Sequence, residues 1–344
     1  MDILVFLLSF VVILASCEFF TNGVEWVGKR FKLSEGAVGS VLAAIGTALP
    51  ETLVPLIAIF ALKGDAGKEI GTGAILGAPF MLATLALFVC GVSVLVFARR
   101  RKTRTLHIDG RLIKRDLRFF LFAFSLAAIA AIVPPELSLF KTIVGFTLIP
   151  IYIVYMFVTL KSGESGGEGD LNDLYIDSAI KKIAPIKSNE PHTALILIQV
   201  FASLAGIILG AALFVGQIND IATMIGINPL ILSLIISPLA TELPEKFNSM
   251  LWIRANKDTF AIGNITGAMV FQSCIPVTIG VLLTSWHLNL SDKVQFLEAA
   301  TIAIAIISAV VLYWHSNHKE IKIGALMFGG LLYLVFFAIV LLSI

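Results

Sequence analysis

The feature that most limits the fold of this chain is a series of long apolar segments. Ten of them approach or exceed the roughly 20 helical residues that cross the hydrocarbon core of a bilayer. They cover residues 3–20, 37–62, 70–98, 118–133, 139–160, 194–215, 229–253, 260–286, 294–314 and 323–344. Only 14% of the 344 residues are charged, whereas soluble domains carry about 25%. The sequence therefore predicts an all-α membrane protein with ten transmembrane helices.

Charged residues in the predicted loops indicate how the chain is oriented. Most of the 25 Lys and Arg residues lie in the odd-numbered loops, above all in residues 99–118. The positive-inside rule then places the odd loops in the cytoplasm and both termini outside, in a multi-pass protein of the plasma membrane. We interpret the basic third loop as this topology signal, which also contacts anionic lipid of the bilayer. No nucleic-acid partner is expected.

Several kinds of site lack the residues they would need. The three cysteines, Cys17, Cys90 and Cys274, fall inside predicted helices without paired spacing, which argues against a disulfide framework or a zinc site. All His and Asp residues are expected in loops or at helix ends, which excludes a histidine-ligated metal centre in mid-membrane. No cofactor is expected. The chain opens without a basic n-region, so we expect the first helix to be retained rather than cleaved.

An internal repeat divides the chain. Residues 47–51 read Thr-Ala-Leu-Pro-Glu and residues 241–245 read Thr-Glu-Leu-Pro-Glu, and the Gly-rich block at 73–78 recurs at 263–268. The copies lie five spans apart, so they cross the membrane in opposite directions. We predict a first five-helix half over residues 1–160, a cytoplasmic linker over 161–192 and a second half over 193–344. Inverted repeats with helices broken by Pro or Gly are typical of transporters that bind their substrate at the midplane.

Each copy of the repeat ends in a glutamate that is predicted to lie inside the membrane. A charged side chain there costs at least about 2.5 to 3.5 kcal/mol, so it normally faces a water-filled path or a partner. Lys246 could form a structural ion pair with one of these acids. One lysine, however, cannot neutralise Glu51, Glu242 and Glu245 together. We therefore predict that Glu51 and Glu245 serve a function.

The donor set around the two prolines suits a hard cation. Proline removes a hydrogen-bond donor, so Pro50 and Pro244 should free backbone carbonyls one turn earlier in the chain. Calcium takes 6 to 8 oxygen ligands, whereas magnesium is harder to dehydrate and is less favoured. The predicted ligands are the carboxylates of Glu51, Glu242 and Glu245, the hydroxyls and carbonyls of Thr47 and Thr241, and the amide of Asn264.

Two other polar residues and the linker have open roles. Glu18 could guard an entry path or reach water at the membrane interface. Gln272 could reach the site or bond a neighbouring helix. The linker begins with a Ser-, Gly- and Glu-rich stretch and is interpreted as flexible. Its acidic residues could form a regulatory ion site, although no EF-hand spacing is present.

With these elements the chain resembles the calcium/cation antiporter superfamily. The sodium/calcium exchangers of that superfamily carry two inverted repeats with a Gly-Thr-Ser-Leu-Pro-Glu element and a Gly-Asn-x-x-Gly-Ser-Asn element. The resemblance implies an exchanger-like fold, in which two outer helices slide past the core. It also implies that Glu51 and Glu245 match the central calcium ligands, and that Thr47 and Thr241 match ion-coordinating threonines.

The repeats also depart from the pattern of the exchangers. The serine of the first element is Ala48 in one copy and Glu242 in the other, and the first asparagine of the second element is Ala74 in one copy. Sodium sites therefore do not follow from the resemblance. The function expected is antiport of calcium or a related cation against sodium, and proton-coupled antiport is the alternative. A passive channel and an intramembrane enzyme are weaker alternatives, since the enzyme would need a catalytic constellation that the spans lack.

Overall fold

A computed structural model describes residues 2–30, 49–62, 65–161, 173–183, 190–316 and 320–343 of the chain. The first group of elements comprises α1 (Asp2–Arg30), α4 (Leu49–Ala61), α5 (Asp65–Met81), the π-helical turn η2 (Leu82–Ala86), α6 (Leu87–Val96), α7 (Ala98–Arg101), β1 (Thr105–His107), α8 (Gly110–Ile132), η3 (Pro135–Leu137) and α9 (Ser138–Lys161). The second comprises α10 (Tyr175–Ile183), α11 (Thr193–Ile225), α12 (Pro229–Thr241), α13 (Leu243–Arg254), α14 (Asp258–Leu283), α15 (Lys293–His315), β2 (Glu320–Lys322) and α16 (Ile323–Ser343).

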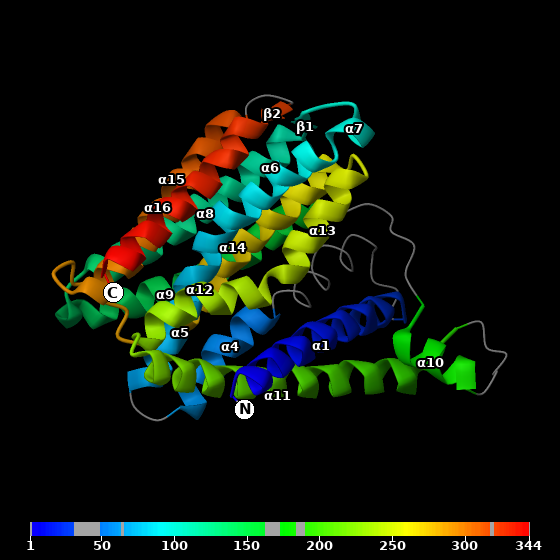
Figure 1. Ribbon diagram of the computed structural model, residues 1–344, viewed down its shortest axis with the longest axis horizontal. Coiled ribbons are helices and arrows are strands. Elements are labelled where there is room, and N and C mark those ends of the chain that lie inside the picture. Colours follow the sequence, from blue (N-terminus) through cyan, green and yellow to red (C-terminus); the bar gives the residue numbers. More distant parts are fainter. Residues whose placement is uncertain are drawn as a thin grey trace.

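The helices form a large bundle with a long helix pair along one edge (Figure 1). In the bundle, α14 packs against α8 and α9, and in a matching way α5 and η2 pack against α15 and α16. The edge pair consists of α1 and α11, which lie side by side. Helix α4 lies between the pair and the bundle, because it contacts α11, α5 and α14. The short strands β1 and β2 pair antiparallel, with Leu106 opposite Ile321.

Buried apolar side chains form two main clusters that follow this division. The larger cluster draws on the bundle helices, with fully buried residues such as Phe80, Phe120 and Phe336. The smaller cluster joins α1, α4 and α11 to one face of α5, through residues such as Ile13 and Phe214. The boundary between the two clusters therefore runs along α5 and α12.

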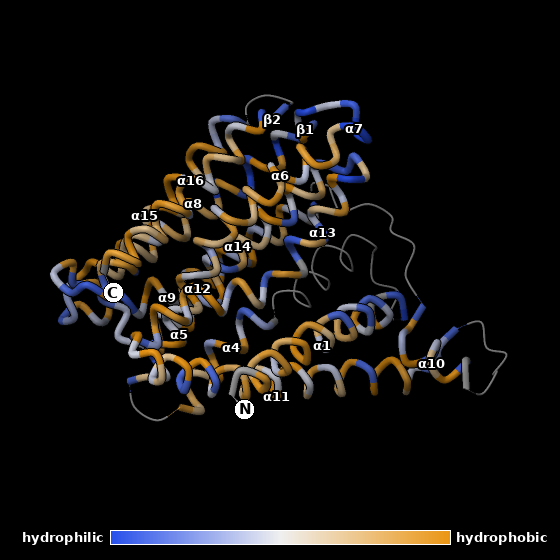
Figure 2. The backbone as a smooth tube through the Cα atoms, viewed as in Figure 1, coloured by the Kyte–Doolittle hydropathy of each residue, from blue (hydrophilic) through white to orange (hydrophobic). Residues whose placement is uncertain are grey.

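The outer surface of the helices is apolar. Large side chains such as Phe122, Phe146, Phe201 and Leu334 are more than half exposed. Figure 2 shows hydrophobic residues along the helices and hydrophilic residues gathered at the helix ends, notably around α7, β1 and β2. A continuous apolar surface of this kind marks contact with a membrane. The chain is an integral, multi-pass membrane protein.

The predicted count of ten transmembrane helices is not confirmed by the structure. Within the described part of the chain, seven helices are long and apolar enough to cross a membrane. Pro50–Ala61 and Pro229–Thr241 are apolar but shorter. Pro229–Thr241 is short because the predicted span 229–253 is broken into two helices. Of the predicted span 37–62, residues 37–48 lie outside the described residues. The expected fourth span, 118–133, lies in α8, which is not one of the seven. The first half of α8 carries several charged residues, Arg111, Lys114, Arg115, Asp116 and Arg118.

The linker contains an ordered element that the sequence interpretation did not foresee. Residues 175–183 form helix α10, and polar side chains of the edge pair hold its beginning. Asn22 of α1 accepts a hydrogen bond from the backbone N–H of Tyr175, and Gln199 of α11 accepts one from the backbone N–H of Ile176. The prediction of a flexible linker is therefore wrong for this segment, because buried side chains on two helices bind its backbone.

Candidate cation-binding site

The second copy of the repeat lies at a break between two helices. Helix α12 ends at Thr241 and α13 begins at Leu243, while Glu242 has φ −88° and ψ 7° and belongs to neither helix. Pro244 occupies the second position of α13, where its missing N–H is tolerated. The carbonyl of Ala240, four residues earlier, consequently receives no hydrogen bond from residue 244, because proline has no backbone N–H. The helix break predicted from the proline is present.

The first copy places its glutamate at the beginning of a helix. Pro50 and Glu51 are the second and third residues of α4. The Glu51 side chain is 4% exposed. No other described residue donates a hydrogen bond to either carboxylate oxygen. Buried polar groups are normally hydrogen-bonded, so a carboxylate in this condition is a candidate for binding a ligand.

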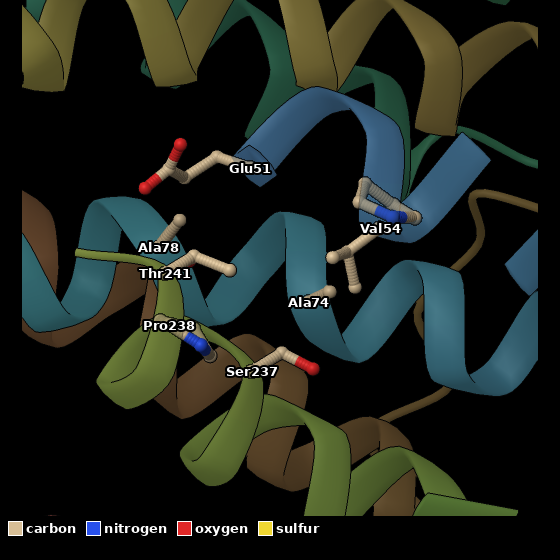
Figure 3. Close-up of a pocket in the computed structure, with 8 residues that line it drawn as sticks. Glu51, Val54, Ala74, Ala78, Ser237, Pro238 and Thr241 are labelled. Atoms are coloured by element: carbon tan, nitrogen blue, oxygen red, sulfur yellow. The ribbon is translucent and has the colours of Figure 1, made fainter. Parts of the chain in front are cut away.

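The Glu51 side chain borders a small pocket where three helices meet (Figure 3). The other lining residues are Val54 and Pro55 from α4, Ala74 and Ala78 from α5, and Ser237, Pro238 and Thr241 from α12. Thr241 is the last residue of α12 and is 2% exposed. The pocket therefore brings the carboxylate of the first repeat to the break of the second.

Close packing of α5 on α12 fixes this meeting point. A Cβ atom added to Gly73 would collide with the backbone carbonyl of Leu230, and one added to Gly77 would collide with that of Leu234. The prediction that glycines bring a helix against a break is confirmed here. For the second Gly-rich block it stays a prediction, because the break of the first repeat lies partly outside the described residues. Among the described residues, Cβ atoms at Gly263 and Gly267 would meet the side chains of Leu112 and Tyr155, which lie on α8 and α9.

A chain of hydroxyl groups in α12 presents an oxygen acceptor to the pocket. Ser233 donates to the carbonyl of Ile70 over 2.7 Å, and it is 3.1 Å from the hydroxyl of Ser237. A hydroxyl has one proton. Since Ser233 uses its proton for Ile70, Ser237 must donate to Ser233 and keeps only lone pairs for a further partner. Sequence reasoning missed Ser237, although Ser233, Ser237 and Thr241 are four residues apart and share one helix face.

Glu242 is paired with the lysine of the same turn. The Lys246 Nζ is 2.8 Å from the Glu242 Oε2, and the two side chains are 5% and 1% exposed. The sequence left open which acid Lys246 would neutralise. The structure assigns it to Glu242 rather than to Glu51 or Glu245.

Glu245 and Asn264 meet through the backbone. Glu245, in the first turn of α13, is 3% exposed. The amide nitrogen of Asn264 donates to the Glu245 carbonyl and to the Ser249 hydroxyl, both over 3.2 Å. Because that nitrogen can only donate, the Asn264 side-chain oxygen is the atom that could bind a cation.

The charges of the two repeats lie within electrostatic reach of one another. Glu51 interacts with Glu245, Glu242 and Lys246. In the described residues, however, no three acidic, His or Cys side chains converge closely enough to hold a metal ion by themselves. Thr47 lies outside the described residues. A cation between Glu51 and Glu245 would therefore also need hydroxyl or carbonyl oxygens. Ser237 and Thr241 line the same pocket as Glu51, and Ala240 lies just before the helix break.

The two residues with open roles have different surroundings. Glu18 is exposed and accepts a 2.6 Å hydrogen bond from the Tyr175 hydroxyl of α10. Gln272 on α14 is 2% exposed, and its side-chain oxygen has no hydrogen-bond partner within the described ranges. Within these ranges, the side-chain oxygen of Gln272 therefore forms no hydrogen bond to a neighbouring helix.

Asp116 is a buried acid that the sequence interpretation did not place inside a helix. Asp116 was expected in a loop or at a helix end, but it lies inside α8 and is 1% exposed. It accepts hydrogen bonds from Thr266 over 2.8 Å and from Tyr155 over 3.2 Å. Its spacing from the buried residues Ile113 and Phe120 would have placed it on the inner face of a helix. Asp116 is thus satisfied by protein partners, unlike Glu51.

Comparisons with known proteins match most of the chain. The family model described as sodium/calcium exchanger protein matches residues 1–161 and 195–344. An uncharacterized membrane protein of Methanocaldococcus jannaschii is 25% identical, with 98% of this chain and 96% of that protein covered. The sodium/calcium exchanger MaX1 of Methanosarcina acetivorans is 23% identical, with 93% of each covered.

Solved structures show the same fold. The crystal structure of the H+/Ca2+ exchanger CAX matches with a TM-score of 0.73 at 14% identity, over 99% of this chain and 86% of that one. A structure of the sodium-calcium exchanger NCX_Mj matches with a TM-score of 0.60 at 22% identity, over 98% and 97% of the two chains. At these identities the likeness concerns the fold alone.

Proposed function

The chain belongs to the sodium/calcium exchanger protein family, and we propose that it exchanges calcium or a related cation for sodium or protons at a site between Glu51 and Glu245. The family consists of ion exchangers, so the protein is a transporter of inorganic cations and not an enzyme. The observation that carries the proposal is the buried carboxylate of Glu51, whose two oxygens receive no hydrogen bond from any other described residue.

The proposed ligands combine carboxylates with neutral oxygens. Glu51 and Glu245 supply charge, while Thr47, Thr241 and Asn264 supply hydroxyl, carbonyl or amide oxygens. Ser237 joins this set, because its hydroxyl is held as an acceptor at the pocket. Oxygens of this number and kind suit calcium, which takes 6 to 8 of them in flexible geometry. We propose that the two glutamates hold calcium and the coupling ion in alternation.

The proposed mechanism is alternating access across ten membrane crossings. The reciprocal packing of α14 on α8 and α9, and of α5 and η2 on α15 and α16, supports two inverted five-helix halves. The smaller apolar cluster, through which α1 and α11 pack on α4, α5 and α12, is distinct from the larger cluster of the bundle and supports motion of that pair against the bundle. With the basic loops in the cytoplasm, both termini would lie outside the plasma membrane. Labelling of single cysteines placed at Lys322 and Lys293, from each side of sealed vesicles, tests this orientation.

Ion flux in sealed proteoliposomes tests the exchange itself. We expect calcium uptake when an outward sodium or proton gradient is imposed, and none without a counter-gradient. Glu51→Gln and Glu245→Gln should each reduce uptake to the background of empty vesicles. Glu298→Gln is the matched control, because Glu298 is also buried but has Asp292 and Glu69 as its electrostatic neighbours. Wild-type uptake by the two site variants would refute the proposal, and uptake without a counter-gradient would identify a passive channel.

A calcium-binding titration of the purified protein decides the coupling ion. The family pattern favours sodium, whereas the replacement of two ligand positions by Ala48 and Ala74 favours the proton-coupled alternative. Inhibition of calcium binding by sodium at constant pH supports the first. Inhibition by protons alone supports the second.

A further inference from the structure

Two basic side chains of α8 meet one tyrosine of α15. The Arg118 Nε donates to the Tyr313 hydroxyl over 3.0 Å, and the central carbon of its guanidinium group lies 5.7 Å from the centre of the tyrosine ring. The Lys114 Nζ lies 5.6 Å from the same centre. Both distances are those of cation–π contacts. Residues 118 and 313 are 195 positions apart, so only the fold brings this cluster together.

Neither cation of the cluster has an acidic partner in the described part of the chain. The neighbouring Arg115, by contrast, lies 3.2 Å from the carboxylate of Asp116. Arg118 uses its Nε for Tyr313, and its two terminal nitrogens donate to no described residue. Like charges four residues apart on a helix repel each other. An anion bound between Lys114 and Arg118 would relieve that repulsion.

The cluster lies where the protein surface changes from polar to apolar. Tyr313 and Trp314 are near the end of the membrane-length segment Lys293–His315, and Trp314 is 66% exposed. Tyrosine and tryptophan are enriched at the level of the lipid headgroups. On α8, Phe122 follows Arg118 by one turn and is 62% exposed. The two cations are therefore placed at the border of the bilayer.

One face of α8 carries both kinds of surface. Lys114, Arg118 and Phe122 are spaced four residues apart, so they share this face. Ile129, which is 52% exposed, extends it seven residues further. A guanidinium group with free terminal nitrogens suits a phosphate, because it can donate two parallel hydrogen bonds. The face thus complements a molecule with an anionic phosphate at one end and apolar chains at the other.

We propose that Lys114 and Arg118, held by Tyr313, bind the headgroup phosphate of an anionic phospholipid whose acyl chains lie along the exposed apolar face of α8. The inference narrows the general lipid contact expected of the basic loop to three side chains from two helices. It is independent of the proposed transport activity. The bound headgroup neutralises the two cations and links α8 to α15.

Native mass spectrometry of the purified full chain in detergent tests the ligand. The probes are dioleoyl phosphatidylglycerol, dioleoyl phosphatidylcholine with the same chains but no net charge, and glycerol phosphate as a headgroup without chains. Phosphatidylglycerol should bind about tenfold or more tightly than phosphatidylcholine, because it carries the complementary charge. Glycerol phosphate should bind more weakly still. Equal binding of the two lipids, or glycerol phosphate binding as tightly as phosphatidylglycerol, overturns the proposal.

A pair of double variants tests the location. K114Q/R118Q should weaken phosphatidylglycerol binding about tenfold or more, since each basic residue near the membrane surface contributes to the attraction of anionic lipid. R99Q/R100Q is the matched control, because it removes the same charge from exposed positions of α7. It should change the affinity less than about twofold. Equal losses in the two variants would show diffuse attraction by surface charge and overturn the proposal.

The role of the tyrosine is tested by Tyr313→Phe. This change keeps the ring and removes the oxygen that accepts from Arg118. Phosphatidylglycerol binding should weaken about two- to fivefold, because the guanidinium group loses its anchor. In the K114Q/R118Q background the same change should have no further effect. Wild-type affinity of Tyr313→Phe overturns the assignment, and this variant decides the question even if K114Q/R118Q does not fold.

Discussion

Two buried polar regions of this protein have opposite hydrogen-bond states. Where α10 meets the edge pair, Gln199 donates to the Phe19 carbonyl and to the Asn22 side chain over 2.8 Å each, and it accepts from Ile176 over 2.9 Å. Asn22 also donates to the carbonyl of Asp173. The side-chain polar atoms of Asn22 and Gln199 thus have hydrogen-bond partners within the protein. Satisfied networks of this kind hold a structure together.

At the junction of α4, α5 and α12 the reverse holds. The carboxylate of Glu51 is as deeply buried as Asn22, yet no other described residue donates to it. Proteins keep such costly groups where function needs them. The difference teaches that burial alone does not distinguish a structural polar group from a binding group. The presence or absence of protein partners does.

The largest test of this contrast is Glu51→Gln. The variant should lose calcium uptake by about 100-fold or more, since a cation loses half of its charged ligands. Without ions it should be more stable than wild type by about 1 kcal/mol or more, because an uncompensated buried carboxylate is removed. Thermal unfolding of the ion-free protein in detergent measures this change, with Glu298→Gln as control. A marked loss of stability would mean that Glu51 is structural.

The opposite pattern is expected of Gln199→Ala. Removing this side chain leaves buried backbone and side-chain groups without partners, at about 1 to 3 kcal/mol. The melting temperature should fall, and amide exchange at the beginning of α10 should become faster. Calcium affinity should stay within about twofold of wild type. If affinity falls together with stability, the two regions are coupled and the contrast fails.

A smaller effect is expected at the pocket wall. Ser237→Ala removes a neutral ligand oxygen and should weaken calcium binding about 3- to 10-fold. Ser233→Ala is the control, because Ser233 donates to Ile70 and supports Ser237 without lining the pocket. It should weaken binding less than Ser237→Ala does. Equal effects in a calcium titration would show that the hydroxyl pair serves helix packing only.

The smallest effect is expected for Tyr175→Phe, at the border of the satisfied region. Tyr175 donates to Glu18. Burial, followed by this hydrogen bond, raises the pKa of Tyr175 to about 12. Its contribution to stability is fully present below the ordinary tyrosine pKa near 10, and is lost as pH rises toward 12. The stability difference between variant and wild type should therefore be constant from pH 6 to 9. Denaturant titrations in that range check it, and a clear slope would contradict the assignment.

Much of the function could be predicted from short sequence elements. The family and the membrane location are confirmed. The helix break at Pro244 followed from the missing N–H of proline, which acts locally. Repeated Thr-x-Leu-Pro-Glu elements identified Glu51 and Glu245, and their roles as ligands stay predictions. Local chemistry and composition are visible in a sequence, because each depends on neighbouring residues only.

Other features could not be predicted because they depend on distant segments. Asn22 and Gln199 are 177 residues apart and meet only in the fold, so the docking of α10 had no local signal. The acceptor state of Ser237 depends on the carbonyl of Ile70, which lies on another helix. Gly73 and Gly77 of α5 meet α12 closely, whereas Gly263 and Gly267 of α14 meet side chains of α8 and α9.

The sequence by itself determined that this chain is a membrane exchanger with duplicated acidic elements, because apolar length, proline and carboxylate burial cost are properties of short segments. The tertiary structure decided which acids are compensated. It paired Lys246 with Glu242 and left Glu51 at the pocket, since whether a buried charge has a partner depends on which side chains the fold brings within hydrogen-bond distance.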